Sequence, residues 1–151
     1  MLQSPDIRQR KQVMAVALGR APADLVVHSA ALLNVFSGEV LSDTTIAVCD
    51  RWVAWVGRNG QPNIGPHTQV IDAGGKTIIP GLIDGHTHLA WLFRIDAFLE
   101  KVIPSGTTTI VTETLEPYPV GGVAGVVDFL DSLTNQPIKI LATAPPMVSN
   151  S

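Results

Sequence analysis

The sequence has one cysteine, few aromatic residues and no long apolar run, and each scarcity excludes a class of protein. Cys49 is the single cysteine of 151 residues, so the chain cannot form an internal disulfide. No secretory signal is recognisable, and a reducing, cytoplasmic location is expected. Uninterrupted apolar stretches are too short for a membrane-spanning helix, so we expect no membrane partner.

Charge is scarce as well. Charged residues make up 15% of the chain, hydrophobic residues 46%, and the formal net charge is −3. This composition is too apolar for a disordered chain, and it has no basic stripe that would bind nucleic acid. Thirteen glycines and eleven prolines separate short apolar segments, a pattern typical of strands joined by tight turns.

The first half of the chain predicts a helix followed by a group of short strands. Ile7, Met14 and Leu18 share one helical face, so residues 1–20 are expected to form an N-terminal helix. Residues 21–77 alternate β-branched residues with turn residues and predict a meander that is a small β-sandwich or half of one. The expected strands are Leu25–His28, Ala31–Phe36, Thr45–Cys49, Val53–Gly57, Gln69–Asp72 and Lys76–Ile79.

The second half alternates buried strands with helices, which predicts an α/β fold with a parallel sheet. Residues 78–151 read as the first βαβαβ units of a (β/α)8 TIM barrel. They are too few to close it, because a barrel needs roughly 200 residues or more, so we expect a truncated barrel. The expected elements are strands Ile78–Asp84, Thr107–Thr112 and Ile138–Ala142, with helices Trp91–Ile103 and Val120–Leu133.

The strongest chemical signal follows the first of these barrel strands. His86 and His88 are two residues apart, so a strand would present both imidazoles on one face. Both can reach one divalent cation at about 2.0–2.1 Å, and strand C-termini are where barrels place catalysis. We predict that His86 and His88 are metal ligands; the alternative is two polar residues at a strand end.

Two carboxylates follow the second barrel strand. Glu113 and Glu116 could ligate or bridge metal, or transfer protons; the alternative is two solvated glutamates. The remaining candidates are expected to be structural. Cys49 is interpreted as a buried small hydrophobe and Trp91 as a packing residue.

The stretch Pro80-Gly81-Leu82-Ile83-Asp84-Gly85-His86-Thr87-His88 resembles the first barrel strand of the amidohydrolase superfamily, Pro-Gly-hydrophobic-Ile-Asp-x-His-x-His. Within it, the chain most resembles the family of bacterial-type adenine deaminases. It differs from that family's Asp-Pro-His-Glu at Glu113-Thr114-Leu115-Glu116, and from its Ile-Glu-Ser-Ser at Leu89-Ala90-Trp91-Leu92. The stretches that carry the resemblance are Ala21–Val27, Asn34–Glu39, Asp72–His88 and Ile103–Thr109.

The resemblance implies a metal-dependent hydrolase. It implies one or two divalent ions (Mn, Fe or Zn) on His86, His88 and ligands from later strands. Water activated there would convert adenine to hypoxanthine and ammonia, with Glu116 in a catalytic role. It also implies a small-molecule substrate, purine or cyclic amide, and a homo-oligomeric full-length parent, with this fragment inactive alone. The alternatives are a dihydroorotase-like or imidazolonepropionase-like enzyme, and a non-catalytic truncated gene product.

Overall fold

The computed structural model describes residues 4–58, 62–92 and 94–144, and the chain divides into two compact units, Met1–Pro80 (unit 1) and Gly81–Ser151 (unit 2). Residues 145–151 of the expected barrel portion lie outside the described residues. Within the described part, no helix combines the length and the apolar character that crossing a bilayer requires.

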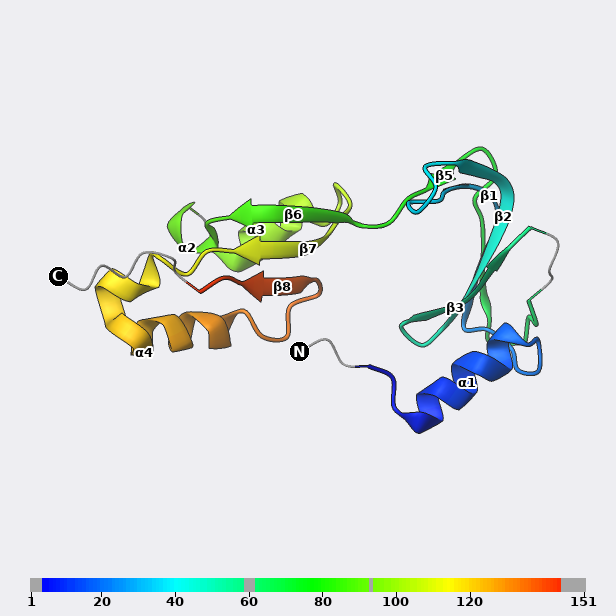
Figure 1. Ribbon diagram of the computed structural model, residues 1–151, viewed down its shortest axis with the longest axis horizontal. Helices are drawn as coiled ribbons and strands as arrows, with labels where there is room; N and C mark the ends of the chain where they lie inside the picture. The colour runs from blue at the N-terminus through cyan, green and yellow to red at the C-terminus, as the bar shows by residue number, and fades with distance from the viewer. Residues whose placement is uncertain (1–3, 59–61, 93, 145–151) are drawn as a thin grey trace. The chain divides into compact units, whose positions relative to one another are not determined.

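Unit 1 contains one helix and one five-stranded sheet (Figure 1). The strand order is β3-β2-β1-β4, and β5 also pairs with β1. The β1–β2 and β2–β3 pairs are antiparallel, whereas β4 and β5 run parallel to β1. The elements are α1 (Ile7–Ala17), β1 (Leu25–Leu33), β2 (Val40–Cys49), β3 (Trp52–Gly57), β4 (Gln69–Asp72) and β5 (Thr77–Ile78).

Helix α1 begins at a capping box. Asp6 Oδ1 accepts a hydrogen bond from the Gln9 backbone N–H at 2.8 Å, and Gln9 Oε1 accepts one from the Asp6 N–H at 3.0 Å. The helix packs through Val16, which is 2% exposed, and not through the predicted face, whose three members are all more than half exposed. The core of unit 1 consists of Val16, Ala23, Val26, Ala47 and Cys49, so Cys49 is the buried small residue that we expected.

Two predictions for unit 1 are corrected. The expected strand Leu25–His28 and the first half of Ala31–Phe36 form one strand, β1, which ends at Leu33 and continues through an irregularity at Ser29, a residue with a positive φ of 63°. The parallel partners of β1 rule out a simple meander. The described residues of unit 1 form a single sheet, and the β-sandwich portion stays a prediction. An open apolar cavity of about 580 Å³ lies along this sheet, lined by residues that include Val53 and Val56.

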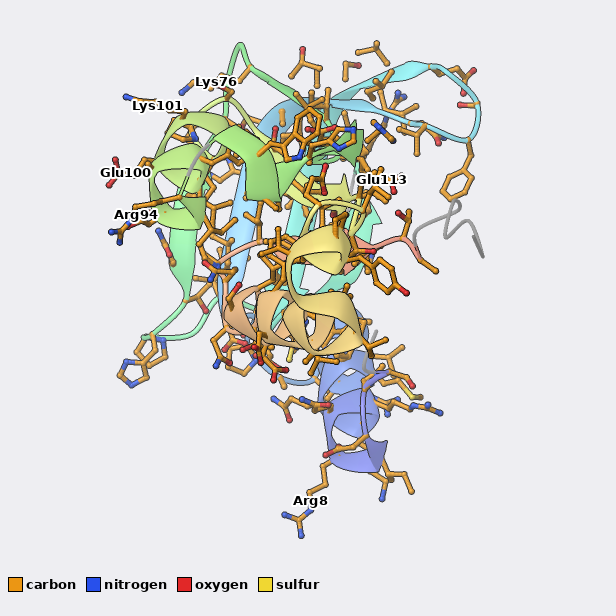
Figure 2. All side chains as sticks on the ribbon, turned by 90° about the vertical axis from the view of Figure 1, so that its left-hand side faces the viewer. Arg8, Lys76, Arg94, Glu100, Lys101 and Glu113 are labelled. Atoms are coloured by element: carbon orange, nitrogen blue, oxygen red, sulfur yellow. The ribbon has the colours of Figure 1, made fainter. Side chains whose placement is uncertain are left out.

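Unit 2 is a three-stranded parallel sheet with helices between its strands, as the alternation predicted (Figure 1). Its core is formed by Leu89, Leu99 and Ile110. The exposed charged side chains of Glu100 and Lys101 lie on the helix Ile95–Val102 (α3), and that of Arg94 lies just before it (Figure 2). The elements are β6 (Leu82–Thr87), α2 (Leu89–Leu92), α3 (Ile95–Val102), β7 (Thr107–Thr112), α4 (Pro117–Ser132) and β8 (Lys139–Ala142).

The first barrel strand differs from the prediction in both position and burial. It runs over Leu82–Thr87, not Ile78–Asp84, because Ile78 pairs with Leu32 in unit 1 and Pro80 lacks an N–H. Leu82 and Ile83 are 49% and 68% exposed, since β6 is an edge strand. Gly81 has no room for a side chain, because a Cβ there would overlap the side chain of Thr108 on β7.

The predicted helices also change at their ends. The expected helix Trp91–Ile103 is two helices, α2 and α3, because Arg94 has an extended backbone with ψ 142°. Helix α4 begins three residues earlier than predicted, at Pro117, where proline suits a first helical position. It is interrupted at Gly122, whose φ of 59° suits glycine.

Candidate metal centre

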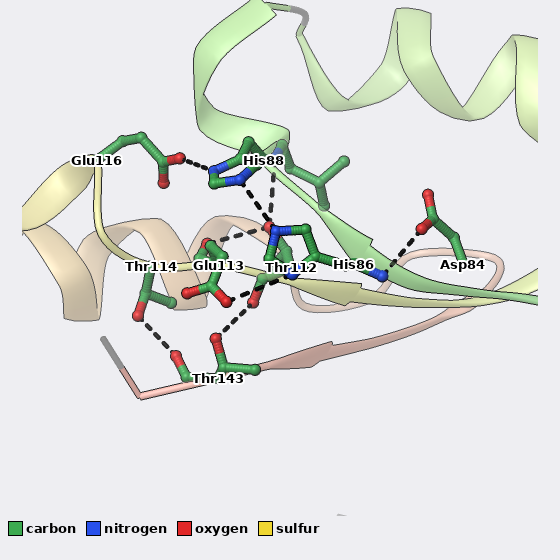
Figure 3. A network of polar contacts seen from close by, with 9 residues as sticks. Asp84, His86, His88, Thr112, Glu113, Thr114, Glu116 and Thr143 are labelled. Carbon is green, nitrogen blue, oxygen red and sulfur yellow. Dashed lines mark hydrogen bonds and ion pairs between the residues drawn. The ribbon is translucent and has the colours of Figure 1, made fainter. Parts of the chain in front are cut away.

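A cluster of histidine, glutamate and threonine side chains of unit 2 lies where its three parallel strands end (Figure 3). His86 lies at the end of β6 and His88 follows it. Glu113 follows β7, and Glu116 lies at the N-terminus of α4. Because parallel strands place their carboxyl ends at one edge of a sheet, residues up to 30 positions apart in the chain become neighbours here.

The two imidazoles converge. His86 Nε2 lies 3.2 Å from His88 Nε2, and the ring centroids are 5.0 Å apart at an interplanar angle of 75°. Asp84 supports the end of β6 locally, because its Oδ1 accepts the His86 backbone N–H at 3.1 Å. The structure thus brings together the pair that the sequence singled out, while the role of the pair as metal ligands stays a prediction.

Each imidazole faces its own carboxylate. Glu116 Oε1 accepts a hydrogen bond from Nδ1 of His88. Glu113 Oε1 lies 3.6 Å from Nδ1 of His86, within ion-pair distance. The side chains of Glu116 and Glu113 are 7% and 14% exposed. The alternative of two solvated glutamates therefore does not describe these side chains. Sequence reasoning missed the pairing, since no local signal joins Glu116 to a histidine 28 residues earlier.

The carboxylate at His88 determines which ring nitrogen is available. A carboxylate only accepts hydrogen bonds, so His88 donates to it from Nδ1, and in the tautomer that does so Nε2 has the lone pair. This lone pair points toward His86 Nε2. A carboxylate on one ring nitrogen and an open lone pair on the other is the arrangement typical of metal-binding histidines.

The distance between the two nitrogens suits a shared cation. Two nitrogens 3.2 Å apart, each about 2.05 Å from one ion, subtend an angle of about 100° at that ion, close to tetrahedral geometry. The described residues contain no group of three or more His, Cys, Asp or Glu side chains arranged to hold a metal. The residues present therefore fit a metal as two donors of an incomplete ligand set.

Two further features border the imidazoles. Glu116 Oε2 is buried and has no hydrogen-bond partner among the described residues, an arrangement that costs about 1–3 kcal/mol when nothing satisfies it. Trp91 does not pack as expected. It is 68% exposed, with its ring centroid 5.5 Å from that of His88 at a tilt of 30°.

The other histidines lie in unit 1. Nδ1 of His28 contacts Ser29 Oγ at 2.8 Å and lies 3.7 Å from Asp72 Oδ1, whereas the side chain of His67 is exposed. Ser29 and Asp72 approach the same ring nitrogen, so these residues do not form the relay of a serine nucleophile, in which hydroxyl and carboxylate use opposite nitrogens.

Comparison with solved structures supports the fold of the two units. The chain superposes on an N-acyl-D-glutamate deacylase from Bordetella bronchiseptica, solved with zinc and a phosphonate inhibitor, with a TM-score of 0.60. The match covers 83% of this chain and 30% of that protein at 20% identity, which supports the mixed α/β fold alone. No closed barrel is present in the described residues.

Sequence comparison is more specific. No family model matches the chain. It is 41% identical over 142 residues to the adenine deaminase of Paracoccus denitrificans, and 38% identical over 141 residues to adenine deaminase 3 of Rhizobium meliloti. Each match covers 93% of this chain, and the chain spans about a quarter (24%) of the length of these relatives. The resemblance predicted from the motifs is confirmed: the chain is homologous to the N-terminal region of the adenine deaminases.

Proposed function

We propose that the chain supplies the first metal ligands of an adenine deaminase-like amidohydrolase, an enzyme that converts adenine and water to hypoxanthine and ammonia. The observation that carries the proposal is the convergence of His86 Nε2 and His88 Nε2 at 3.2 Å, on the C-terminal edge of the first strand of a parallel sheet. The remaining ligands would come from later strands of a (β/α)8 barrel.

The residues present have separable roles in this reaction. His86 and His88 would hold the ion, which when bound supplies a Lewis acid and lowers the pKa of coordinated water toward neutrality. Glu116 Oε1 keeps the proton of His88 on Nδ1, so that Nε2 stays a donor. The second oxygen, Glu116 Oε2, has no partner among the described residues and would be the atom that accepts and returns a proton.

The test is a chimera in which this chain replaces the matching quarter of the Paracoccus denitrificans enzyme. We expect the folded chimera to release hypoxanthine and ammonia from adenine, measured by chromatography. His86→Ala and His88→Ala should abolish this activity, while His67→Ala, an exposed histidine of unit 1, should leave it unchanged. The chain alone should show no turnover, because two donors leave a metal weakly held.

The same assay separates the alternatives. Dihydroorotate and imidazolonepropionate belong in the substrate panel, since enzymes acting on these cyclic amides are the nearest rivals. A folded chimera that holds metal and leaves adenine unchanged would contradict the proposed deaminase activity. A chimera that holds no metal would contradict the assignment of the histidine pair.

A further inference from the structure

A buried hydroxyl at the end of β7 contacts the two segments that follow β6 and β7. Thr112 is fully buried at the end of β7. Its Oγ1 accepts the backbone N–H of Leu89 at 3.3 Å and donates to the backbone carbonyl of Glu113 at 3.1 Å. Leu89 directly follows His88, and Glu113 faces His86, so one hydroxyl contacts the backbone beside both imidazole–carboxylate pairs (Figure 3).

The contacts of Thr112 continue to the third strand. The Thr143 backbone N–H donates to the Thr112 carbonyl at 3.0 Å. Thr114, which is 2% exposed and lies between the two glutamates in the chain, donates from Oγ1 to the Thr143 carbonyl at 2.7 Å. The loop that carries Glu113 and Glu116 is thereby tied to the end of β8.

The position of these hydroxyls along β7 is informative. Ile110, Thr112 and Thr114 are all almost completely buried, at 0%, 0% and 2% exposure. An aliphatic side chain fills the site in the middle of the strand, whereas hydroxyls occur where the strand reaches the imidazoles. A β-branched side chain needed only for its shape would serve as valine, so the two hydrogen bonds at Thr112 call for a separate explanation.

We propose that Thr112 is a positioning residue, which holds the backbone at Leu89 so that His88 meets Glu116 with Nε2 directed at His86. This rests on the proposed function, because the aligned nitrogens are those assigned to the metal. Loss of such an outer hydrogen bond typically lowers metal affinity by about 10–100-fold.

Two variants separate the role of the Thr112 hydroxyl from the role of the shape of its side chain. Thr112→Val keeps the volume and removes both hydrogen bonds, while Thr112→Ser keeps the hydroxyl and removes the methyl group. We expect Thr112→Val to weaken zinc binding by the chimera, which supplies the later ligands, about tenfold in calorimetry, and Thr112→Ser to retain the affinity even where it melts lower. Thr108→Val, at an exposed threonine of the same strand, is the matched control and should bind as the parent does.

A measurement without metal keeps the two proposals apart. In the zinc-free chain, the ¹⁵N shifts of the His88 ring should report a proton fixed on Nδ1 in the parent and in Thr112→Ser, and a mixture of tautomers in Thr112→Val. Failure of the folded parent chimera to bind zinc would overturn the metal site, while the His88 tautomer in the zinc-free chain still tests Thr112. Unchanged affinity and tautomer in Thr112→Val, or equal losses in both variants, would overturn the positioning role.

Discussion

The two units differ in strand direction, and the difference explains where the chemistry collects. In unit 1, β1, β2 and β3 are antiparallel, so successive strand ends fall on opposite edges, and the core is apolar. In unit 2, three parallel strands end together, and two of the three buried polar residues in the described chain, Thr112 and Thr114, lie at that edge. The three parallel strands of unit 2 therefore bring polar side chains together at one edge, whereas the antiparallel strands β1 to β3 of unit 1 do not.

The largest expected effect comes from the core of unit 2. Ile110→Ala should lower the free energy of unfolding of this unit by about 2–5 kcal/mol, because Ile110 is fully buried and the deletion leaves a cavity. Hydrogen exchange should show amides of β6, β7 and β8 losing protection while those of β1 and β2 keep theirs. Val16→Ala is the counterpart in unit 1 and should give the reverse pattern. Equal losses throughout the chain in either variant would show that the units do not unfold separately.

The next effect tests the carboxylates that distinguish unit 2. Glu116→Gln should weaken zinc binding by the chimera about tenfold, or about 1.4 kcal/mol, because a neutral amide fixes the proton of His88 less firmly. Glu113→Gln should cost less, since Glu113 Oε1 is 3.6 Å from His86 Nδ1 and His86 is the more exposed histidine. Calorimetry on both variants measures the order, and a larger loss at Glu113 would contradict the geometry.

A smaller effect is expected at the capping box of α1. Asp6→Ala should destabilise unit 1 by about 1 kcal/mol, because the first turn loses a side-chain acceptor. Urea unfolding followed on α1 amides measures this loss, with zinc affinity unchanged. Arg8→Ala, which removes an exposed side chain of the same helix (Figure 2), is the control. A control as destabilised as the cap variant would refute the capping role.

The smallest effect concerns pH. Burial, followed by the charges of Asp24 and Asp50, raises the pKa of the Cys49 thiol above its ordinary value of 9.0. Above that pH, the Cys49 thiol ionises in the unfolded chain before it ionises in the folded protein. The stability that the buried neutral thiol contributes is therefore present below pH 9 and declines as the pH rises. Alkaline unfolding curves of the parent and Cys49→Ala should differ in slope above pH 9 and run parallel below it. Equal slopes throughout would show that Cys49 does not contribute.

The sequence predicted elements best where one local signal was sufficient. The strand Thr107–Thr112 is observed as predicted, because a run of β-branched residues is bounded by Gly106 and a change of composition. The first barrel strand was misplaced because Ile78 and Ile79 continue the apolar pattern across Pro80. The pairing of Ile78 with Leu32 in unit 1 decides where that residue belongs, and no local pattern contains that information.

In the candidate site too, the features that depend on one local signal could be predicted, and those that depend on partners elsewhere in the chain could not. The imidazole pair was predictable because alternation within one strand fixes which side chains are neighbours. The partners of that pair depend on the register between β6 and β7, where irregularities occur between Leu82 and Ile83 and between Asp84 and Thr87. The face of α1 was mispredicted for a related reason, since Val16 is selected by the sheet it meets, and not by periodicity.

The absence of a side chain at residue 81 has a consequence for the imidazoles further along β6. Gly81 lets the start of β6 lie directly against Thr108, where any larger residue would overlap. A substitution there would oblige β6 to lift or slide along β7, and a slide of one position would turn His86 and His88 to the opposite side of the sheet. Glycine at residue 81, directly before β6, thus determines on which side of the sheet the imidazoles of His86 and His88 lie at the other end of the strand.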